Sequence, residues 1–381
     1  MTIRGIRHLS FSVLFALVFS SAVAQYRYVN PTFAWKKQVA RIIDIPEKKG
    51  SSAHAGKRQK TLYQMIVDAC KAGDIPLYAN SDQNFSVKLT REEGAAIAGL
   101  NNRIYRPVPR YRILEDWSFD PTTCKTEIQI TGIAPIREIY DSDGTYRGRQ
   151  AMFWIRYNDL RKVLARDEQL HGSNSLTNHI WNDYFSQDTV YVTKDEWRKT
   201  SAIRTMDIPD NSDTIAHHLR VYSDSSLVDM IMNLKRSGIV SSFADDDFTT
   251  TLHKWGIIDQ WLDTLIITDP VSDKEVKKYM PHGIHNFGRQ QYNILESWRF
   301  NPVSGKTEIE ITGLAPAVEI TGNNDYFPKI RPQFWVKYED VQEAISKYDQ
   351  YQPGNSFALH IWDSYFLSDI KPVKKTNSAI H

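Results

Sequence analysis

The stretch that decides the fold occurs twice in the chain. Residues Ile113–Ile139 read ILEDWSFDPTTCKTEIQITGIAPIREI, and residues Ile294–Ile320 read ILESWRFNPVSGKTEIEITGLAPAVEI. With a shift of 181 residues and no gap, 17 of the 27 positions are identical. An ungapped match of this length is far beyond chance, so the sequence predicts two copies of one structural unit.

The repeat extends in both directions from this stretch. Downstream the shift of 181 also aligns Phe153-Trp154 with Phe334-Trp335, and upstream Leu62–Gly73 resembles Leu227–Gly238 at a smaller offset. The change of offset places extra residues in the second copy, between about 249 and 291. We therefore predict a first unit over residues 25–192 and a second over 193–381.

Local patterns predict both helices and strands in each unit. The stretch Leu62–Gly73 has apolar residues at helical spacing, with a capping box at Thr61 and Gln64 and a glycine stop. Lys125–Thr131 alternates as a half-buried strand does, and the turn Asp120–Cys124 joins it to a preceding strand. The fold class predicted is α+β: two homologous units in tandem, each a small, mainly antiparallel sheet with flanking helices.

A last helix is predicted after Asn174-Ser175, which we expect to cap it, and an equivalent helix ends the second unit. Trp181 and Trp362 occupy matching positions on these helices. We predict that each indole is buried against the sheet of its own unit, and that the two units have separate cores.

The N-terminus has the pattern of a secretory signal peptide. Arg4 and Arg7 precede the apolar run Phe11–Phe19, which is too short to span a membrane, and Ala22-Val23-Ala24 resembles a cleavage site. We predict a signal peptide over residues 1–24 with cleavage after Ala24, and no membrane span in the mature chain. The alternative interpretation of this segment is a membrane anchor.

Composition narrows the class of protein. Residues 25–381 hold 45 basic and 45 acidic side chains, a balance that does not favour nucleic acid as a partner. Two cysteines are too few for a disulfide-based or cysteine-rich metal module. Cys70 and Cys124 align with Lys235 and Gly305 in the second copy, and whether they pair is left open.

Candidate chemical sites are few, and each has a simpler structural interpretation. Asp141–Gly144 resembles half of a calcium loop, but a hairpin turn is favoured because Met152 stands where the loop needs a bidentate acid. Asp245–Asp247 is interpreted as a solvated loop. So is the basic segment Lys48–Lys60, with partner docking as its alternative.

Histidines and glutamates give no convincing site either. His282 and His285 have ligand-like spacing and His217-His218 are adjacent, but no cysteine or carboxylate cluster lies beside them. Residues matched between the copies are interpreted as structural: His179 and His360 on a helix, and Glu127 and Glu308 on the outward face of a strand. We assign no catalytic, cofactor-binding or metal-binding residue, and predict that the protein is not an enzyme.

The order of short motifs resembles the GldN/PorN family, which belongs to the type IX secretion and gliding machinery of Bacteroidetes. The first copy supplies Trp35, Ile43-Asp44-Ile45, Leu62–Gly73, Trp117–Phe119, Gly132–Pro135 and Phe153-Trp154. The second supplies Trp197, Met206-Asp207-Ile208, Leu227–Gly238, Trp298–Phe300, Gly313–Pro316 and Phe334-Trp335.

This resemblance implies a non-enzymatic structural subunit in the periplasm, peripherally associated with the outer membrane. It implies two partners, an outer-membrane lipoprotein of the GldK/PorK type and an inner-membrane motor component of the GldM/PorM type, and assembly into a ring. The alternative is a stand-alone exported binding module that holds a glycan or a peptide on exposed aromatic rings. That alternative requires Trp117 and Trp298 to be exposed to solvent.

Overall fold

The computed structural model describes residues 35–45, 60–97, 110–185, 197–208, 227–252, 262–268, 275–281, 290–320, 329–351, 353–367 and 371–374. The predicted signal peptide lies outside these residues. So do most of the basic segment Lys48–Lys60 and the histidines 217, 218, 282 and 285.

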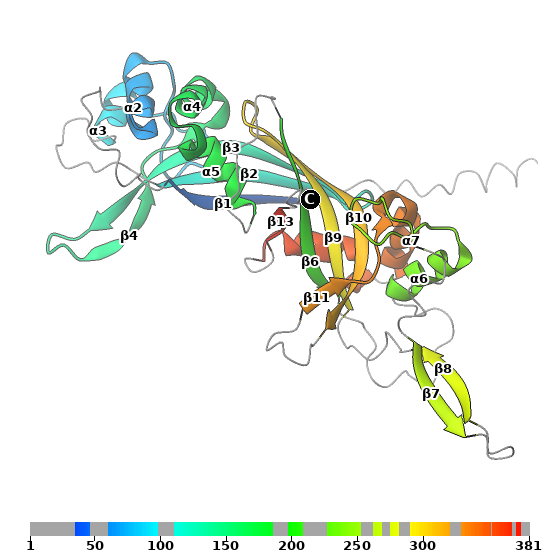
Figure 1. The fold of residues 1–381 in the computed structure, drawn as a ribbon. Helices are drawn as coiled ribbons and strands as arrows, with labels where there is room; N and C mark the ends of the chain where they lie inside the picture. The colour runs from blue at the N-terminus through cyan, green and yellow to red at the C-terminus, as the bar shows by residue number, and fades with distance from the viewer. Residues whose placement is uncertain are drawn as a thin grey trace, which may run out of the picture.

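The strands of both units form one continuous antiparallel sheet (Figure 1). Its main path among the described residues has the order β1-β2-β3-β10-β9-β6-β13. These strands are β1 Trp35–Asp44, β2 Arg110–Asp120, β3 Lys125–Tyr140, β10 Lys306–Ile320, β9 Gln290–Asn301, β6 Arg198–Ile208 and β13 Val373–Lys374.

Shorter strands extend the two long central ones. β4 (Tyr146–Ala151) and β5 (Ile155–Arg156) pair with β3, while β11 (Lys329–Pro332) and β12 (Val336–Lys337) pair with β10. A separate two-stranded sheet, β7 (Leu262–Thr268) and β8 (Glu275–Pro281), lies in the predicted extra segment of the second unit.

The helices of the first unit are α2 Leu62–Ala72, α3 Arg91–Ile97, α4 Tyr157–His171 and α5 Leu176–Asp183; those of the second are α6 Leu227–Ser237, α7 Tyr338–Tyr351 and α8 Phe357–Ser364. In Figure 1, α2, α3 and α4 lie at one end of the sheet, and α6 and α7 lie at the other. Short 3-10 helices, η1 Gly172–Asn174 and η4 Pro353–Asn355, precede α5 and α8.

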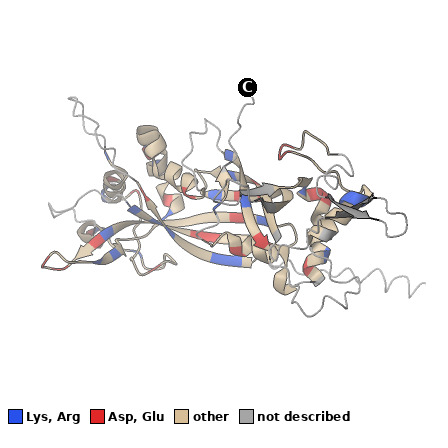
Figure 2. Ribbon diagram, turned by 60° about the horizontal axis from the view of Figure 1, so that its bottom comes forward, with Lys and Arg blue, Asp and Glu red and all other residues tan. Residues whose placement is uncertain are grey.

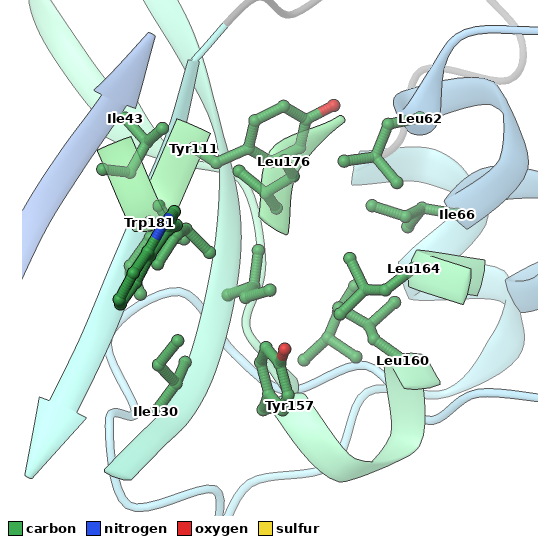
Figure 3. Packing of buried hydrophobic residues seen from close by; sticks show 14 of the residues in the cluster. Ile43, Leu62, Ile66, Tyr111, Ile130, Tyr157, Leu160, Leu164, Leu176 and Trp181 are labelled. Carbon is green, nitrogen blue, oxygen red and sulfur yellow. The ribbon is translucent and has the colours of Figure 1, made fainter. Parts of the chain in front are cut away.

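Local sequence signals place several of these elements correctly. Thr61 and Gln64 form the predicted capping box of α2, which ends at Gly73 with a φ of 84°. Side chains from α2 and α4, among them Ile66 and Leu160, point toward the strands in Figure 3 and belong to the same buried cluster as the strand residue Ile130. The α+β class and the hairpin of β2 and β3 are confirmed.

The predicted caps of the last helices are only partly right. Ser356 accepts a hydrogen bond from the backbone N–H of Leu359, at 3.1 Å, and so caps α8. Ser175 precedes α5, but its side chain makes no capping bond. A carboxylate from α4 replaces it: Asp167 Oδ2 accepts from the backbone N–H of Leu176 at 2.8 Å.

The expectation of two separate cores is wrong. Trp181 of α5 is buried, but its ring stacks on Phe300 of β9, which belongs to the second unit. Trp362 of α8 is only partly buried, and its ring packs on Phe119 of β2, in the first unit. The reason is the pairing of β3 with β10, which makes one sheet of two and brings the strands of each unit under the last helix of the other.

A glycine in the repeated motif lets a loop close over the other face of the sheet. A Cβ atom at Gly132 would lie 2.5 Å from the ring of Phe85, and one at Gly313 would lie 2.7 Å from the ring of Phe248. Both phenylalanines adopt a positive φ of 57°. The ring is therefore seated directly on a strand backbone in both units, which explains why this position is glycine in both copies.

Candidate partner-binding face

The middle of the sheet has one face that is open to solvent and lined by polar side chains. Along β3 and β10 the buried residues Thr126, Ile128, Thr307 and Ile309 alternate with residues on this opposite face. Figure 2 shows basic and acidic residues on the strands. The junction face, as we call it, comprises Lys36, Gln38, Asp116, Ser118, Lys125, Glu127, Gln129, Lys199, Arg299, Lys306, Glu308 and Glu310, which are all exposed or half-buried.

An open depression of about 480 Å³ lies in the junction face. Side chains from β1, β2, β3 and β10 line it, including Gln38, Asp116 and Lys306. Gln38 Nε2 donates to Asp116 Oδ1 at 3.0 Å across the first two of these strands. The depression thus presents amide, carboxylate and ammonium groups together, which suits a polar protein surface better than an apolar ligand.

Ion pairs join the two units across this face. Lys306 Nζ lies 3.1 Å from Glu127 Oε1 and 3.0 Å from Glu308 Oε1. The hydrogen bond to Glu308, followed by that to Glu127, raises the pKa of Lys306. Lys125 and Glu310 form a second cross-unit pair at 2.9 Å. Glu127 and Glu308 are directly opposite each other in the strand register, so Lys306 offsets the repulsion between them.

Beneath the sheet, on the helix-covered face, each unit buries a glutamate at matching positions. Glu296 accepts from Arg204 Nε at 3.0 Å and from the indole N–H of Trp298 at 2.8 Å. Glu115 accepts from Trp117 Nε1 at 2.9 Å and also pairs with Arg41. Each carboxylate accepts hydrogen bonds from a buried indole and an arginine in the interior, so the two clusters stabilise the packing of the core.

These clusters also hold the indole rings of Trp117 and Trp298, whose exposure to solvent the sequence does not determine. Trp117 and Trp298 are 5% and 1% exposed, and each is tied to its glutamate by the indole N–H. The binding module with exposed aromatic rings required both to face solvent, so that alternative is wrong. The cause is the buried glutamate two residues earlier on the same strand, which draws the indole inward.

The matched histidines are half-buried on their helices, and each bonds to the asparagine that ends the preceding 3-10 turn, two residues before the helix. His179 Nε2 is 3.2 Å from Asn174 Oδ1, and His360 Nε2 is 2.7 Å from Asn355 Oδ1. Burial lowers the pKa of His360, which favours the neutral ring. Both contacts brace the short 3-10 turn against the helix, which is a structural role.

The two acidic loops bind their own backbone. Asp141–Gly144 forms the favoured hairpin turn, in which the N–H of Gly144 donates to the Asp141 carbonyl at 3.0 Å. Asp245 accepts from the N–H groups of Thr249 and Thr250, at 2.8 and 3.0 Å. The side-chain hydrogen bond from Thr250, followed by the backbone bond from Thr249, lowers the pKa of Asp245 to about 2. Among the described residues, no group of three or more His, Cys, Asp and Glu is placed to hold a metal ion.

The two cysteines are free thiols in different clusters of the core. Burial raises the pKa of both Cys70 and Cys124 to about 12, so both are protonated at neutral pH. No helix within the described residues combines the length and the hydrophobicity that crossing a bilayer requires.

Sequence patterns identified the outward direction of Glu127 and Glu308 but did not bring them together. The alternation of Lys125–Thr131 holds the signal for a polar face, yet the partner of its strand lies almost half a chain away. The junction face therefore emerges only from the pairing of β3 with β10.

One family model matches the chain in two consecutive segments. Residues 30–191 and residues 192–370 each match the family model described as "Gliding motility associated protein GldN". Together the two matches cover well over half of the sequence. No curated protein matches the sequence with significance.

Proposed function

Because the chain belongs to the GldN family and is a component of the gliding-motility and type IX secretion machinery, we propose that it is a non-enzymatic structural subunit whose junction face binds a partner. The partner proposed is the outer-membrane lipoprotein of the GldK/PorK type, with a ring as the assembled state. The inner-membrane motor component of the GldM/PorM type is the second proposed partner. A cleavable signal peptide ending at Ala24 would deliver the chain to the periplasm.

The observation that carries the proposal is the junction face itself. It spans both units, mixes charges of both signs and remains open to solvent while the opposite face is packed under helices. Polar faces of this kind set partner choice and orientation through complementary charge.

Two exposed lysines allow a direct test. Lys36 on β1 and Lys199 on β6 occupy matching positions in the two units and lie on the junction face. We expect the double variant Lys36→Glu/Lys199→Glu to reduce co-purification with the lipoprotein from outer-membrane fractions by about tenfold or more. Either single variant should reduce it less if both units take part.

A matched control keeps the result specific. Lys162→Glu reverses an exposed charge on α4, away from the face, and should leave recovery unchanged. If the double variant folds like the parent and is recovered with the lipoprotein as efficiently, the junction face is not the binding surface. Recovery of the parent protein only as a free monomer would overturn the structural role.

A further inference from the structure

The pairing of β3 with β10 is symmetric about one pair of residues. Glu127 faces Glu308, and these two glutamates are themselves equivalent under the shift of 181. On one side Thr126 faces Ile309, and on the other Ile128 faces Thr307, which is the same pairing with the units exchanged. The junction therefore has an approximate two-fold axis through the Glu127–Glu308 pair.

Aromatic contacts between the units obey the same axis. Trp181 of the first unit packs on Phe300 of the second, with ring centroids 5.8 Å apart. The equivalent Trp362 of the second unit packs on Phe119 of the first, at 5.6 Å. The last helix of each unit thus packs against a strand of the other unit.

A third set of contacts is also exchanged. Tyr157 of the first unit lies against the turn of the second, and its hydroxyl donates to the carbonyl of Pro302. Tyr338 of the second unit lies against the matching turn of the first, where it is hydrogen-bonded to Cys124. Three independent sets of contacts, between strands, between rings and between tyrosine and turn, are therefore reciprocal.

We infer that the junction is an isologous protein–protein interface enclosed in a single chain, and that the surface each unit presents there fits another unit of the same kind. In such an interface the same patch is used on both sides, as in a two-fold homodimer. Its buried aromatic centre and strand pairing are those of a permanent interface. The link between the units raises their effective concentration but is not what holds them together. The inference does not depend on which partner the junction face binds.

The experiment uses the whole chain with a cleavable connection. A protease recognition sequence is inserted between residues 192 and 193, at the predicted boundary, and the purified protein is cut after folding. We expect the two fragments to co-elute in size-exclusion chromatography at micromolar concentration, in equal amounts and at the volume of the uncut protein. Separation of the fragments after cutting, or precipitation of either one, would overturn the inference.

Variants of the cut protein show whether the named contacts hold the fragments together. Trp181→Ala should raise the dissociation constant of the fragments by about 100-fold or more, because it removes one of the two reciprocal ring contacts. Ile66→Val trims the core on α2, outside the contacts exchanged between units, and should leave that constant unchanged. Equal effects of the two variants would show that general destabilisation, rather than the junction, governs the association.

Exchange between molecules tests whether the surface accepts another copy. Two cut preparations carrying different tags on the first unit and on the second unit are mixed. We expect each first unit to be captured with second units from the other preparation after incubation. If fragments stay together yet never exchange, even under mild urea, entanglement of the chains rather than a complementary interface holds them.

Discussion

Trp181 and Phe300 lie in different units of the repeat, yet their rings are stacked, with an angle of 12° between the planes. The indole is 3% exposed and sits among residues of both copies. This contact makes the stability of one unit depend on the other.

Truncation of Trp181 should therefore affect the whole protein. We expect Trp181→Ala to lower the free energy of unfolding by about 3–5 kcal/mol, because it opens a cavity beneath α5. Thermal unfolding followed by limited proteolysis should show both units losing protection together. Trp362→Ala should cost less because that ring is only partly buried. Loss of protection confined to residues before 192 would contradict a shared core.

The packing of the Phe85 ring on the strand backbone can be tested by substituting Gly132, which lies beneath the ring. Gly132→Ala places a methyl group 2.5 Å from the Phe85 ring and should destabilise the protein by about 1–3 kcal/mol. Adding Phe85→Leu should restore part of that loss, because the ring no longer meets the new Cβ. Gly354→Ala adds a methyl group in open space and serves as the control. Urea unfolding of the four proteins gives the comparison.

The buried pair of Arg204 and Glu296 predicts an asymmetric response to mutation. Their side chains are 2% and 0% exposed. Arg204→Met should cost about 3–5 kcal/mol, because it leaves the carboxylate of Glu296 buried with its charge uncompensated. The second change Glu296→Gln removes that charge while keeping an oxygen that can accept from the Trp298 indole, and it should recover stability. Chemical unfolding would contradict this account if the double variant were less stable than Arg204→Met alone.

Asp349 makes stability depend on pH. Burial raises the pKa of this carboxyl to about 6, even though its oxygens accept from the N–H groups of Phe357 and Ala358. The folded state therefore holds the proton more tightly than the unfolded state, whose pKa is near 3.8. The contribution of Asp349 to the free energy of unfolding is therefore complete below about pH 4 and is lost as the pH rises through about 6. The change amounts to about 1–3 kcal/mol.

Replacement of Asp349 isolates this contribution from that of the other carboxyls. The loss of stability from pH 4 to pH 7 should be smaller in Asp349→Asn than in the parent by that amount. Urea unfolding at both pH values measures it. An unchanged difference between the two pH values would show that Asp349 titrates alike in the folded and unfolded chains.

Sequence alone predicts the elements whose signals are local. The capping box at Thr61, the hairpin of β2 and β3 and the outward direction of Glu127 follow from residues close together in the chain. The pairing of β3 with β10 cannot be predicted in this way. The two strands have nearly the same sequence, and nothing in it says whether either strand pairs with the other or remains a solvent-exposed edge of its own sheet. The surroundings of Trp181 were mispredicted for the same reason, since a buried indole looks alike from the sequence whichever unit covers it.

The turns at Cys124 and Gly305 show what it means for both halves of a two-fold interface to be encoded by one gene. Both residues adopt a left-handed backbone, with φ values of 52° and 70°. In a pair of identical chains any substitution would occur at both turns at once. The turn with less space for a side chain would then decide which residues are tolerated at both. Here a Cβ atom at residue 305 would lie 2.7 Å from the Tyr157 ring, whereas residue 124 holds a cysteine against Tyr338. Within a single chain the two turns can differ, and here one holds a cysteine and the other a glycine.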